Sequence, residues 1–519
     1  MSTERIGLID IGSNTVRLVI FETDAYYNLH ELQNIKTPAR LYLYLSEEKI
    51  LNQEGIDKLT KIMHSFKQVA IQYEVDTLMP VATAAIRQSK NQQEILDHIK
   101  EETGIKITLL AEEQEAYYGN YAVLHSIDEP NGVTIDIGGG STEITYFEDK
   151  KLVHSISFPF GVVTLKEMFF DGKAHNDRKA IKKAKSFIQE QFSSLPWIQE
   201  KKVPVIAIGG SARNIANIHQ RMIDYPLAGI HGYQMEREHL SKTLDTLENL
   251  DTDELNDLDG LSRDRTDIIL PANLVFNALF DTVKASAFIF SNKGLREGVI
   301  MEYLNIHHNH PFDLHEIRKQ TVERTARLYN IHPMVARQRV SIADKLFSVL
   351  ANENILEADA YWKTCLRSGS YLYYLGSYID NDAQSQNTFY IIANSNLAGL
   401  NHKDRVILAL LASYKNKSLL KQYIKEIKDW FTEDELTLLH HLGGIIKFSE
   451  ALNDSHINVV KDLAIEKTDD DTYTLRIVHK GDVLAEEYRA NRQKKHLERI
   501  LDAKVDIQFI EADDPVYTS

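Results

Sequence analysis

Two segments of the chain resemble one another, and each combines an aspartate with small residues that can bind phosphate. Residues 6–15 read IGLIDIGSNT and residues 132–142 read GVTIDIGGGST. Each begins with an apolar run typical of a buried strand and ends in a turn of glycine and small polar residues. Such a turn presents several backbone N–H groups and a carboxylate at one point, as a metal-bound phosphate requires. The repeat therefore predicts phosphoryl chemistry in a cleft between two homologous half-domains.

Phosphoryl transfer requires phosphate-binding donors, metal ligands, a cation and a base. Donors for phosphate come from the backbone and hydroxyl groups of the two turns: Gly12, Ser13, Asn14, Thr15, Gly138, Gly139, Gly140, Ser141 and Thr142. For Mg²⁺ or another divalent cation, Asp136 and Glu143 are candidate ligands, and Asp10 could hold a metal-bound water. Arg87, in the segment ATAAIR, could offset charge on the transferring group; the alternative is an ordinary surface arginine.

A third glycine turn follows the apolar run Val203–Ile208 and reads Gly209-Gly210-Ser211-Ala212. It could bind a further part of a phosphate-bearing ligand. The alternative is a tight link between a strand and a helix, where glycine serves the backbone only.

The general base is expected in an acidic cluster within residues 109–116. A predicted strand there runs into the start of a helix that carries Glu112, Glu113 and Glu115. A carboxylate at this place could accept a proton from a water aligned with the terminal phosphorus. The residues alone do not choose among the three, and acids that complement a helix dipole are the alternative.

Size and composition restrict the class of protein. A chain of 519 residues is too long for one core and predicts three or four domains. The formal net charge of −16 argues against a nonspecific nucleic-acid binder. No apolar stretch approaches the roughly 20 residues of a membrane span, and Met1–Arg5 offers no secretory segment. Cys365 is the single cysteine, which excludes an intrachain disulfide and fits a cytoplasmic protein.

The first segment, residues 1–127, alternates predicted strands and helices. The apolar patterns predict strands at Ile6–Ile11, Leu18–Phe21, Thr77–Val81 and Ile105–Leu110, and helices at Gln53–Gln72 and Gln92–Thr103. This alternation predicts an α/β domain with a mixed sheet. The second segment, residues 128–304, is expected to be a similar domain that is closed by a short helix near Val299–Leu304.

The remaining chain changes character twice. Asn305–Pro311 reads as a polar linker, whose histidines lack partners at metal-binding spacing. Residues 312–450 follow a helical pattern almost without interruption. Residues 455–519 are predicted to form a small α+β domain, with strands at Thr472–His479 and Lys504–Ile510 and a helix at Asn491–Asp502.

Six motifs together resemble the long bacterial form of the exopolyphosphatase and guanosine pentaphosphate (pppGpp) phosphohydrolase family. In chain order they are DIGSNTVRL, ATAAIR, the acidic cluster before Ala116, DIGGGSTE, FPFGVVTL and IGGSARNIA, and the strong match covers residues 5–304. That family belongs to the superfamily of actin, sugar kinases and chaperone ATPases. The resemblance implies two actin-like (ribonuclease H-like) half-domains around a cleft, an all-α HD-like domain and a small α+β domain. It also implies a homodimer.

The resemblance assigns roles to particular residues. It implies that Glu115 is the catalytic glutamate, that Asp136 and Glu143 are metal-associated acids, and that Arg87 lies near the substrate. Gly209–Ala212 match the region that holds adenosine in the ATPase relatives.

This sequence also departs from the family pattern at several positions. Glu112 and Gln114 replace a usual glycine and an acid in the cluster. Leu372–Gly376 lacks the His-Asp pair of HD domains, and Asn387 stands where the family has a histidine. A second metal centre is therefore not expected.

The first hypothesis is an exopolyphosphatase, in which water activated by Glu115 removes the terminal phosphate of inorganic polyphosphate with Mg²⁺. The alternatives are hydrolysis of pppGpp to ppGpp, an ATP-dependent kinase or ATPase on the same scaffold, and a nucleotide-sensing protein without catalysis. The helical segment and the tail would supply a groove for the polyphosphate chain and a dimer interface. No basic run marks this groove, and the scattered candidates for it are Arg17, Arg40, Arg213, Arg265 and Arg296.

Overall fold

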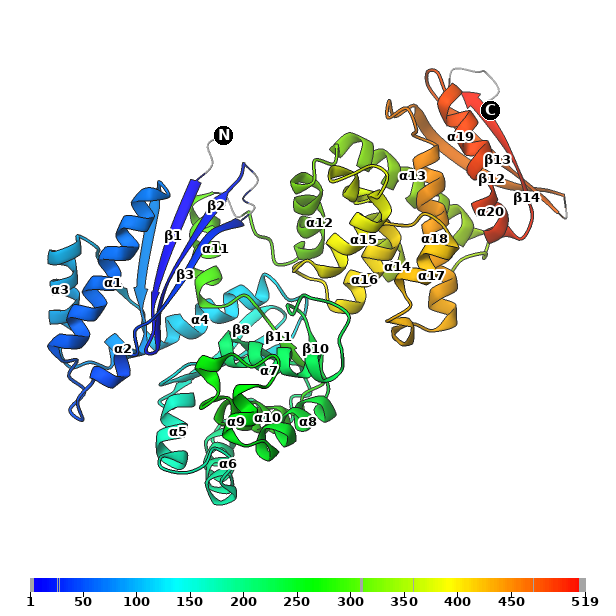
Figure 1. The fold of residues 1–519 in the computed structure, drawn as a ribbon. Coiled ribbons are helices and arrows are strands. Elements are labelled where there is room, and N and C mark those ends of the chain that lie inside the picture. Colours follow the sequence, from blue (N-terminus) through cyan, green and yellow to red (C-terminus); the bar gives the residue numbers. More distant parts are fainter. Residues whose placement is uncertain are drawn as a thin grey trace. The chain divides into compact units, whose positions relative to one another are not determined.

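The fold was analysed in a computed structural model, which describes residues 4–25, 27, 29–308, 311–357, 359–469 and 471–512. The chain divides into two compact units (Figure 1). The amino-terminal unit comprises residues up to Tyr225 together with Ile230–Ile317. The carboxy-terminal unit comprises Pro226–Gly229 and the chain from Arg318 onward. Among the described residues, no helix combines the length and the apolar character needed to cross a bilayer.

The first sheet of the amino-terminal unit has the order β3-β2-β1-β4-β5. Its strands are β1 (Glu4–Ile11), β2 (Thr15–Thr23), β3 (Leu29–Pro38), β4 (Thr77–Ala82) and β5 (Thr108–Leu109). β1, β2 and β3 are antiparallel neighbours, whereas β4 runs parallel to β1 and β5 parallel to β4. The sheet is therefore mixed, as the alternating pattern predicted.

Helices cover one face of this sheet (Figure 1). They are α1 (Gln53–Gln72), the short α2 (Ala84–Arg87) and α3 (Gln92–Thr103), and the predicted bounds of α1 and α3 are confirmed. The apolar side chains of α1 recur at helical spacing and fix the helix on the sheet, because they share one buried core with Ile9 and Leu18. They include Ile56, Leu59, Met63 and Phe66.

The second sheet has the order β10-β11-β9-β6-β7-β8. Its strands are β6 (Gly132–Ile137), β7 (Thr142–Glu148), β8 (Lys151–Phe158), β9 (Val205–Ile208), β10 (Gln234–Met235) and β11 (Phe288–Phe290). The helices of this half are α5 (Val162–Phe170), α6 (Arg178–Ser193), α7 (Gly209–Met222), α8 (Arg237–Asn249), α9 (Thr252–Asn256) and α10 (Ile269–Val283). α10 is apolar on nearly every side because it lies inside the core that α5, α6, α7 and α8 share.

Two helices are exchanged between the halves. α4 (Glu112–Leu124) follows the first sheet in the chain but packs on β6, β7 and β8 of the second. α11 (Leu295–His307) follows the second sheet but buries Ile300 and Leu304 against Ile6 and Leu8 of the first. The sequence predicted that this last helix would close the second half. It covers the first sheet instead.

α4 and α11 also pack against each other. A Cβ atom at Gly298 of α11 would lie 2.1 Å from the carbonyl oxygen of Tyr118 in α4, so the two backbones can approach only with glycine at this position. The helices are thus fixed to one another as well as to the opposite sheets.

The predicted linker at Asn305–Pro311 is partly helical. α11 continues through His307, and Asn305 is buried, where it donates 2.6 Å to the Tyr121 hydroxyl and accepts 2.9 Å from the Phe312 amide. His308 contacts Glu4 at 3.0 Å, and His310 lies outside the described residues. The prediction was wrong for Asn305–His307, because these residues form the end of α11 and Asn305 bonds inside the fold.

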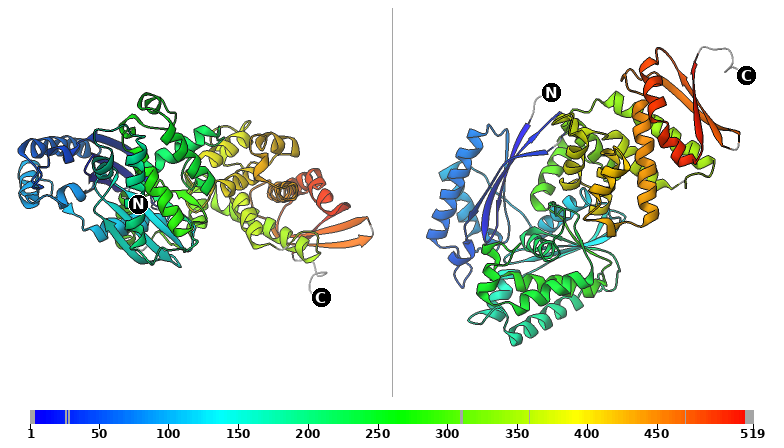
Figure 2. Two further views of the ribbon diagram at one scale, coloured as in Figure 1. Left: turned by 90° about the horizontal axis from the view of Figure 1, so that it is seen from below. Right: turned by 45° about the vertical axis from the view of Figure 1, so that its right-hand side comes forward.

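The carboxy-terminal unit consists of helices followed by a small sheet (Figure 2). The helices are α12 (Ile317–Leu328), α13 (Pro333–Asn352), α14 (Ala360–Tyr371), α15 (Gln384–Asn394), α16 (His402–Ala412), α17 (Lys417–Tyr423) and α18 (Glu433–Ala451). The sheet has the order β12 (Val460–Asp469), β13 (Thr472–His479), β14 (Lys504–Glu511). α19 (Leu484–Gln493) and α20 (Lys495–Leu501) precede β14.

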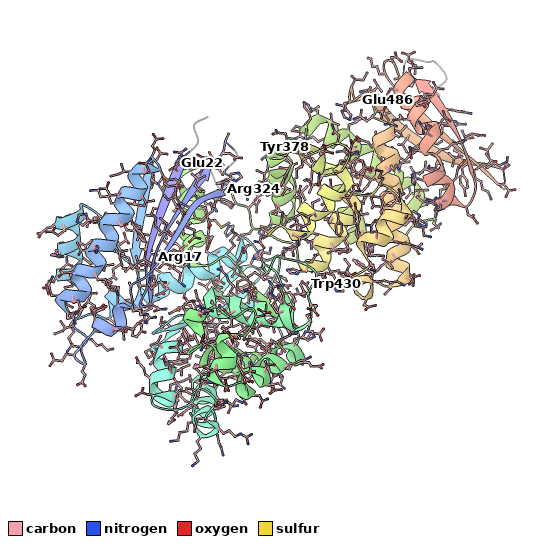
Figure 3. All side chains as sticks on the ribbon, in the orientation of Figure 1. Arg17, Glu22, Arg324, Tyr378, Trp430 and Glu486 are labelled. Atoms are coloured by element: carbon pink, nitrogen blue, oxygen red, sulfur yellow. The ribbon has the colours of Figure 1, made fainter. Side chains whose placement is uncertain are left out.

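The helix predicted at Asn491–Asp502 is therefore two helices, and the first begins seven residues earlier. The start of α19 was not predicted, because the apolar pattern does not mark Glu486 as a buried position. In the structure Glu486 (labelled in Figure 3) is fully buried, and its carboxylate accepts a hydrogen bond of 2.9 Å from the Ser455 amide. A buried acid reads as a surface residue in the sequence.

Candidate active site

A cavity of about 240 Å³ lies in the amino-terminal unit where the two homologous turns meet. The start of α4, α7 and α11 completes its wall. Predicted residues that line it are Asp10, Gly12, Ser13, Asn14, Thr15, Glu115, Asp136, Gly138, Gly139, Gly140, Ser141, Gly209 and Gly210. Four other predicted residues do not line it: Arg87, Thr142, Glu143 and Ser211.

The two turns have the same backbone construction. In the first, Gly12 N donates 3.0 Å to Thr15 O; in the second, Gly138 N donates 2.9 Å to Ser141 O. Asp10 lies directly opposite Arg17 on β2, and Asp136 directly opposite Glu143 on β7. Opposite residues in an antiparallel pair project from the same face, so each aspartate shares its face with that partner. Equivalent positions in the two turns thus carry opposite charges, Arg17 in one and Glu143 in the other.

The second turn is held from behind by the segment that begins α5. Val162 N and Val163 N donate 2.9 and 3.0 Å to the carbonyl oxygens of Gly138 and Gly139. A Cβ at Gly161 would lie 2.4 Å from Gly138 O, so no larger residue fits there. The Thr142 hydroxyl donates 2.6 Å to Phe160 O and is fully buried. Thr142 thus supports the turn and does not face the cavity.

Among the three acids of the cluster, Glu115 alone lines the cavity. It lies in the first turn of α4, and its side chain is 17% exposed, against 46% for Glu112. Burial, together with the charges of Asp136 and Asp10, raises the pKa of Glu115 to about 7 against the opposing effect of Arg87. A carboxyl with this pKa can exchange a proton near neutrality.

Arg87 contacts this carboxylate directly. Its Nη1 donates 2.9 Å to Glu115 Oε2 and 3.0 Å to the Leu110 carbonyl, and its Nε lies 3.7 Å from Glu112. The sequence predicted that Arg87 lies near the substrate, and that role stays a prediction. The structure places it against the predicted base.

The remaining acids also have raised pKa values. Burial raises the pKa of Asp136 to about 6, assisted by Asp10. Burial raises the pKa of Glu143 to about 8, assisted by Glu115 and Asp136, although Ser157 Oγ donates 2.9 Å to its Oε1. Burial likewise raises the pKa of Asp10, against the charges of Arg296 and Arg17. The acids therefore repel one another, and a bound cation would relieve that repulsion.

These carboxylates fit a hard divalent cation, whose preferred ligands are oxygens. In the described ranges no group of three acids, histidines or cysteines has the geometry to hold a metal by itself. Mg²⁺ usually takes only one or two protein carboxylates and completes its shell with water and substrate phosphates. Asp136 and Glu143, which face each other on β6 and β7, match that pattern, and Asp10 could hold a metal-bound water. Metal binding stays a prediction.

Four arginines that the sequence left scattered line this one cavity: Arg17, Arg213, Arg265 and Arg296. Arg17 projects from β2 (Figure 3), and burial and the neighbouring arginines lower its pKa. Arg265 donates 3.1 Å to Ser211 Oγ and packs on Gly210, where a Cβ would lie 2.2 Å from its guanidinium. Ser211 therefore positions Arg265. Arg40, the fifth candidate, lines a different pocket.

The sequence carried one signal for this cluster. The first turn separates Arg17 from Asp10, just as the second turn separates Glu143 from Asp136. The repeat therefore could have predicted that Arg17 lies opposite Asp10, at the cavity. Arg213, Arg265 and Arg296 belong to separate segments and come together only in the fold.

Comparisons with known proteins identify the family of this chain. Residues 19–307 match the family model described as the Ppx/GppA phosphatase family, and residues 317–489 match the model of Ppx/GppA phosphatase, domain III. The structure of the Aquifex aeolicus Ppx/GppA family member is 26% identical and covers 59% of this chain and 100% of its own, with a TM-score of 0.53. A Cytophaga hutchinsonii exopolyphosphatase, 20% identical, shares the fold with a TM-score of 0.53 and covers 58% of this chain and 98% of its own.

A curated relative from Fusobacterium nucleatum, a bifunctional 3-dehydroquinate synthase/phosphatase, is 26% identical over 311 residues. The match covers 57% of this chain and 46% of the relative, so the chain spans about half the length of that protein. The two family models together account for most of the sequence, and the first of them alone covers more than half of it. The chain therefore belongs to the Ppx/GppA phosphatase family.

Proposed function

We propose that this protein is an exopolyphosphatase that hydrolyses the terminal phosphoanhydride bond of inorganic polyphosphate. The observation that carries the proposal is the place of Glu115. It is the acid of its cluster that lines the cavity at which both turns converge, and its pKa of about 7 suits a general base.

Each group of residues has a separate role in this reaction. The backbone of the two turns receives the terminal phosphate, and the four lining arginines offset the charge of the phosphates. Glu115 accepts a proton from a water molecule, whose oxygen bonds to the terminal phosphorus as the bridging P–O bond breaks. Arg87 holds the Glu115 carboxylate in position. Mg²⁺, held by Asp136, Glu143 and Asp10, would supply positive charge to the phosphate oxygens.

The lining of the cavity favours polyphosphate over a nucleotide. Among the described residues no aromatic side chain lines it, whereas four arginines do. A guanine base would be expected to stack on an aromatic ring or on an arginine face. The four arginines share the cavity lining with the acids, so we expect them to bind phosphate rather than a base. One observation favours pppGpp: Asn292 also lines the cavity, and its buried Oδ1 has no hydrogen-bond partner in the described part of the chain.

The test is the phosphate released from long polyphosphate, pppGpp and ATP by the purified protein with Mg²⁺. We expect polyphosphate to be hydrolysed with the highest kcat/KM and ATP with the lowest. Preference for pppGpp would replace the substrate in this proposal, and transfer of phosphate from ATP to an acceptor would replace the reaction class.

Three further expectations from the sequence stay proposals. The fold of the amino-terminal unit is proposed to be actin-like, with Gly209–Ser211 at the place of a nucleotide site in that superfamily. The helices between residues 312 and 450 are proposed to be HD-like without a metal pair. The protein is proposed to act as a cytoplasmic homodimer.

A further inference from the structure

A second cavity of the amino-terminal unit lies beside the one that the two glycine turns line. Its volume is about 420 Å³, and it is here called the side pocket. The segment of residues 263–268 forms a shared wall, because Arg265 and Ile268 line the first cavity whereas Arg263 and Thr266 line the side pocket. The lining of the side pocket includes Arg40, Lys173, His175, Leu255, Arg263 and Pro271. The reaction proposed above uses none of them.

The side pocket carries an excess of positive charge. Within the described ranges, its lining residues Arg40, Lys173 and Arg263 form no ion pair with an acid. The lining also has two acids, and each is already paired with a lysine: Asp264 with Lys36 and Asp267 with Lys166. An anion in this pocket would therefore meet cations that no carboxylate of the chain offsets.

One part of the side pocket is apolar. Phe170, Leu255 and Pro271 line it and are buried. Thr252 and Asn256 add a hydroxyl and an amide group at the same pocket. An apolar surface with a few polar groups, in a cavity of several hundred Å³, is typical of a site for a small organic ligand. A bare inorganic ion would leave this surface uncovered.

His175 gives a further indication of a ligand. It lines the side pocket, and both of its ring nitrogens are buried without a hydrogen-bond partner in the described part of the chain. Buried polar groups without partners are rare and costly. A neutral imidazole has one donor and one acceptor. A ligand with polar groups on a ring would supply the partners that the chain does not.

The walls of the side pocket continue into the cavity with the glycine turns. The backbone N–H of Arg40 donates 2.8 Å to the carbonyl oxygen of Asn14, in the first turn. Arg263 precedes by two residues Arg265, which lines that cavity. α5, which carries part of the pocket lining, begins at Val162, whose amide holds the second turn. A ligand in the side pocket would thus contact segments that position both turns and one arginine of the active site.

We propose that the side pocket binds a nucleoside monophosphate and that its occupancy is transmitted to the active site. The base covers the apolar surface and hydrogen-bonds to His175 and Asn256, while the phosphate lies among the unpaired cations. The ligand joins the two halves of the unit, because Arg40 comes from the first half and Arg263 from the second. The proposal does not rest on the identity of the substrate, since a monophosphate has no phosphoanhydride bond to be hydrolysed.

The first test is calorimetric titration of the full-length protein with AMP, GMP, CMP and UMP. The test variant is Lys173→Gln with Arg263→Gln. The matched control is Lys179→Gln with Arg221→Gln, which removes the same charge from exposed positions that line neither cavity. We expect the Kd of the tightest nucleotide to rise at least tenfold in the test variant and to stay unchanged in the control. Absence of binding, or equal binding by the two variants, would overturn the proposal.

Two fragments of the ligand test whether the base is recognised. Ribose 5-phosphate and orthophosphate keep the anion and lack the base. Both should bind at least tenfold more weakly than the tightest nucleotide, because they leave the apolar surface uncovered. If either binds as tightly as the nucleotide, the pocket is a plain phosphate site and the proposal is wrong.

Kinetics test the transmission to the active site. The substrate is whichever of polyphosphate, pppGpp and ATP the protein hydrolyses, so the wrong substrate in the proposed function would not affect this result. The saturating nucleotide should change kcat at least twofold in the wild type and the control and have no such effect in the test variant. An increase in KM alone, equal in all three proteins, would instead place the nucleotide in the active-site cavity and contradict a separate site.

Discussion

The guanidinium of Arg87 holds the carboxylate of Glu115 at 2.9 Å and is itself fixed by the Leu110 carbonyl. This contact places a positive charge beside the predicted base. It opposes the rise in the pKa of Glu115 that burial causes. Arg87 is therefore a positioning residue that also tunes the proton affinity of its partner.

Replacing Arg87 with glutamine should shift the pH dependence of kcat. With Arg87 present, protonation of Glu115 near pH 7 should produce the acidic limb of the profile. Without it, the pKa of Glu115 rises, so the limb should move to higher pH and activity should recover in alkaline buffer. Arg237→Gln is the control, because Arg237 pairs with Asp281 away from the cavity. A uniform loss of rate with an unmoved limb would contradict this role.

Glu115→Gln should lower kcat by about 10² to 10⁴, the usual contribution of a general base. The matched control is Glu112→Gln, which changes a more exposed acid of the same helical turn that does not line the cavity. It should retain most of the activity. Steady-state release of phosphate measures both, and full activity of Glu115→Gln would remove this residue from the mechanism.

Gly161→Ala should damage the second phosphate turn. Its new Cβ would lie 2.4 Å from Gly138 O and 2.5 Å from Gly139 O, so the turn must shift. Displacement of positioning groups by about 1 Å can cost about 10²-fold in rate. Gly119→Ala is the control, since Gly119 does not line the cavity and a Cβ there makes an ordinary contact with Ile208 at 3.6 Å. Equal kcat/KM values for the two variants would show that the shape of this turn does not matter.

Glu143→Gln should stabilise the metal-free protein at alkaline pH. The pKa of Glu143 is raised to about 8, so the folded state binds its proton more tightly than the unfolded state does. The resulting stability is fully present below the unfolded pKa and is lost as pH rises through about 8. The variant lacks this loss, and its melting temperature at pH 9 should exceed that of the wild type.

Mg²⁺ should reverse the order of the two melting temperatures. It should raise the melting temperature of the wild type more than that of Glu143→Gln, because a ligand is missing in the variant. Glu148→Gln, at the exposed end of the same strand, is the control and should respond as the wild type does. If Mg²⁺ stabilises both proteins equally, Glu143 is not a ligand.

Gly298→Ala should destabilise the amino-terminal unit by about 1–3 kcal/mol, because a methyl group would be forced against the Tyr118 carbonyl. The control lies in the partner helix: at Gly119 a Cβ would meet Ile208 at 3.6 Å, an ordinary contact. Gly119→Ala should be neutral or stabilising by about 0.5–1 kcal/mol. Urea unfolding measures both values.

Local patterns were sufficient to predict one long helix and the two glycine turns that line the cavity. The bounds of α1 were predicted residue by residue, because its apolar stripe has one consistent period. The turns after β1 and β6 followed from their repeated composition. Each of these features is encoded within about twenty neighbouring residues.

Features that depend on distant segments were not predictable. Nothing near Val299 indicates which sheet its helix covers, since both sheets offer apolar faces. The resemblance implied that Arg87 lies near the substrate, and only the fold shows that its Nη1 also contacts Glu115. Arg213, Arg265 and Arg296 line one cavity because three separate segments reach it. These segments are the start of α7, the loop before α10, and the start of α11.

The exchanged helices α4 and α11 have a consequence for the integrity of the protein. Each sheet takes one protective layer from the opposite half, so cutting the chain near residue 127 would strip Ile300 and Leu304 from Ile6 and Leu8. Neither fragment would then be expected to survive alone in a cell. The two halves are accordingly expected to unfold in one melting transition instead of two.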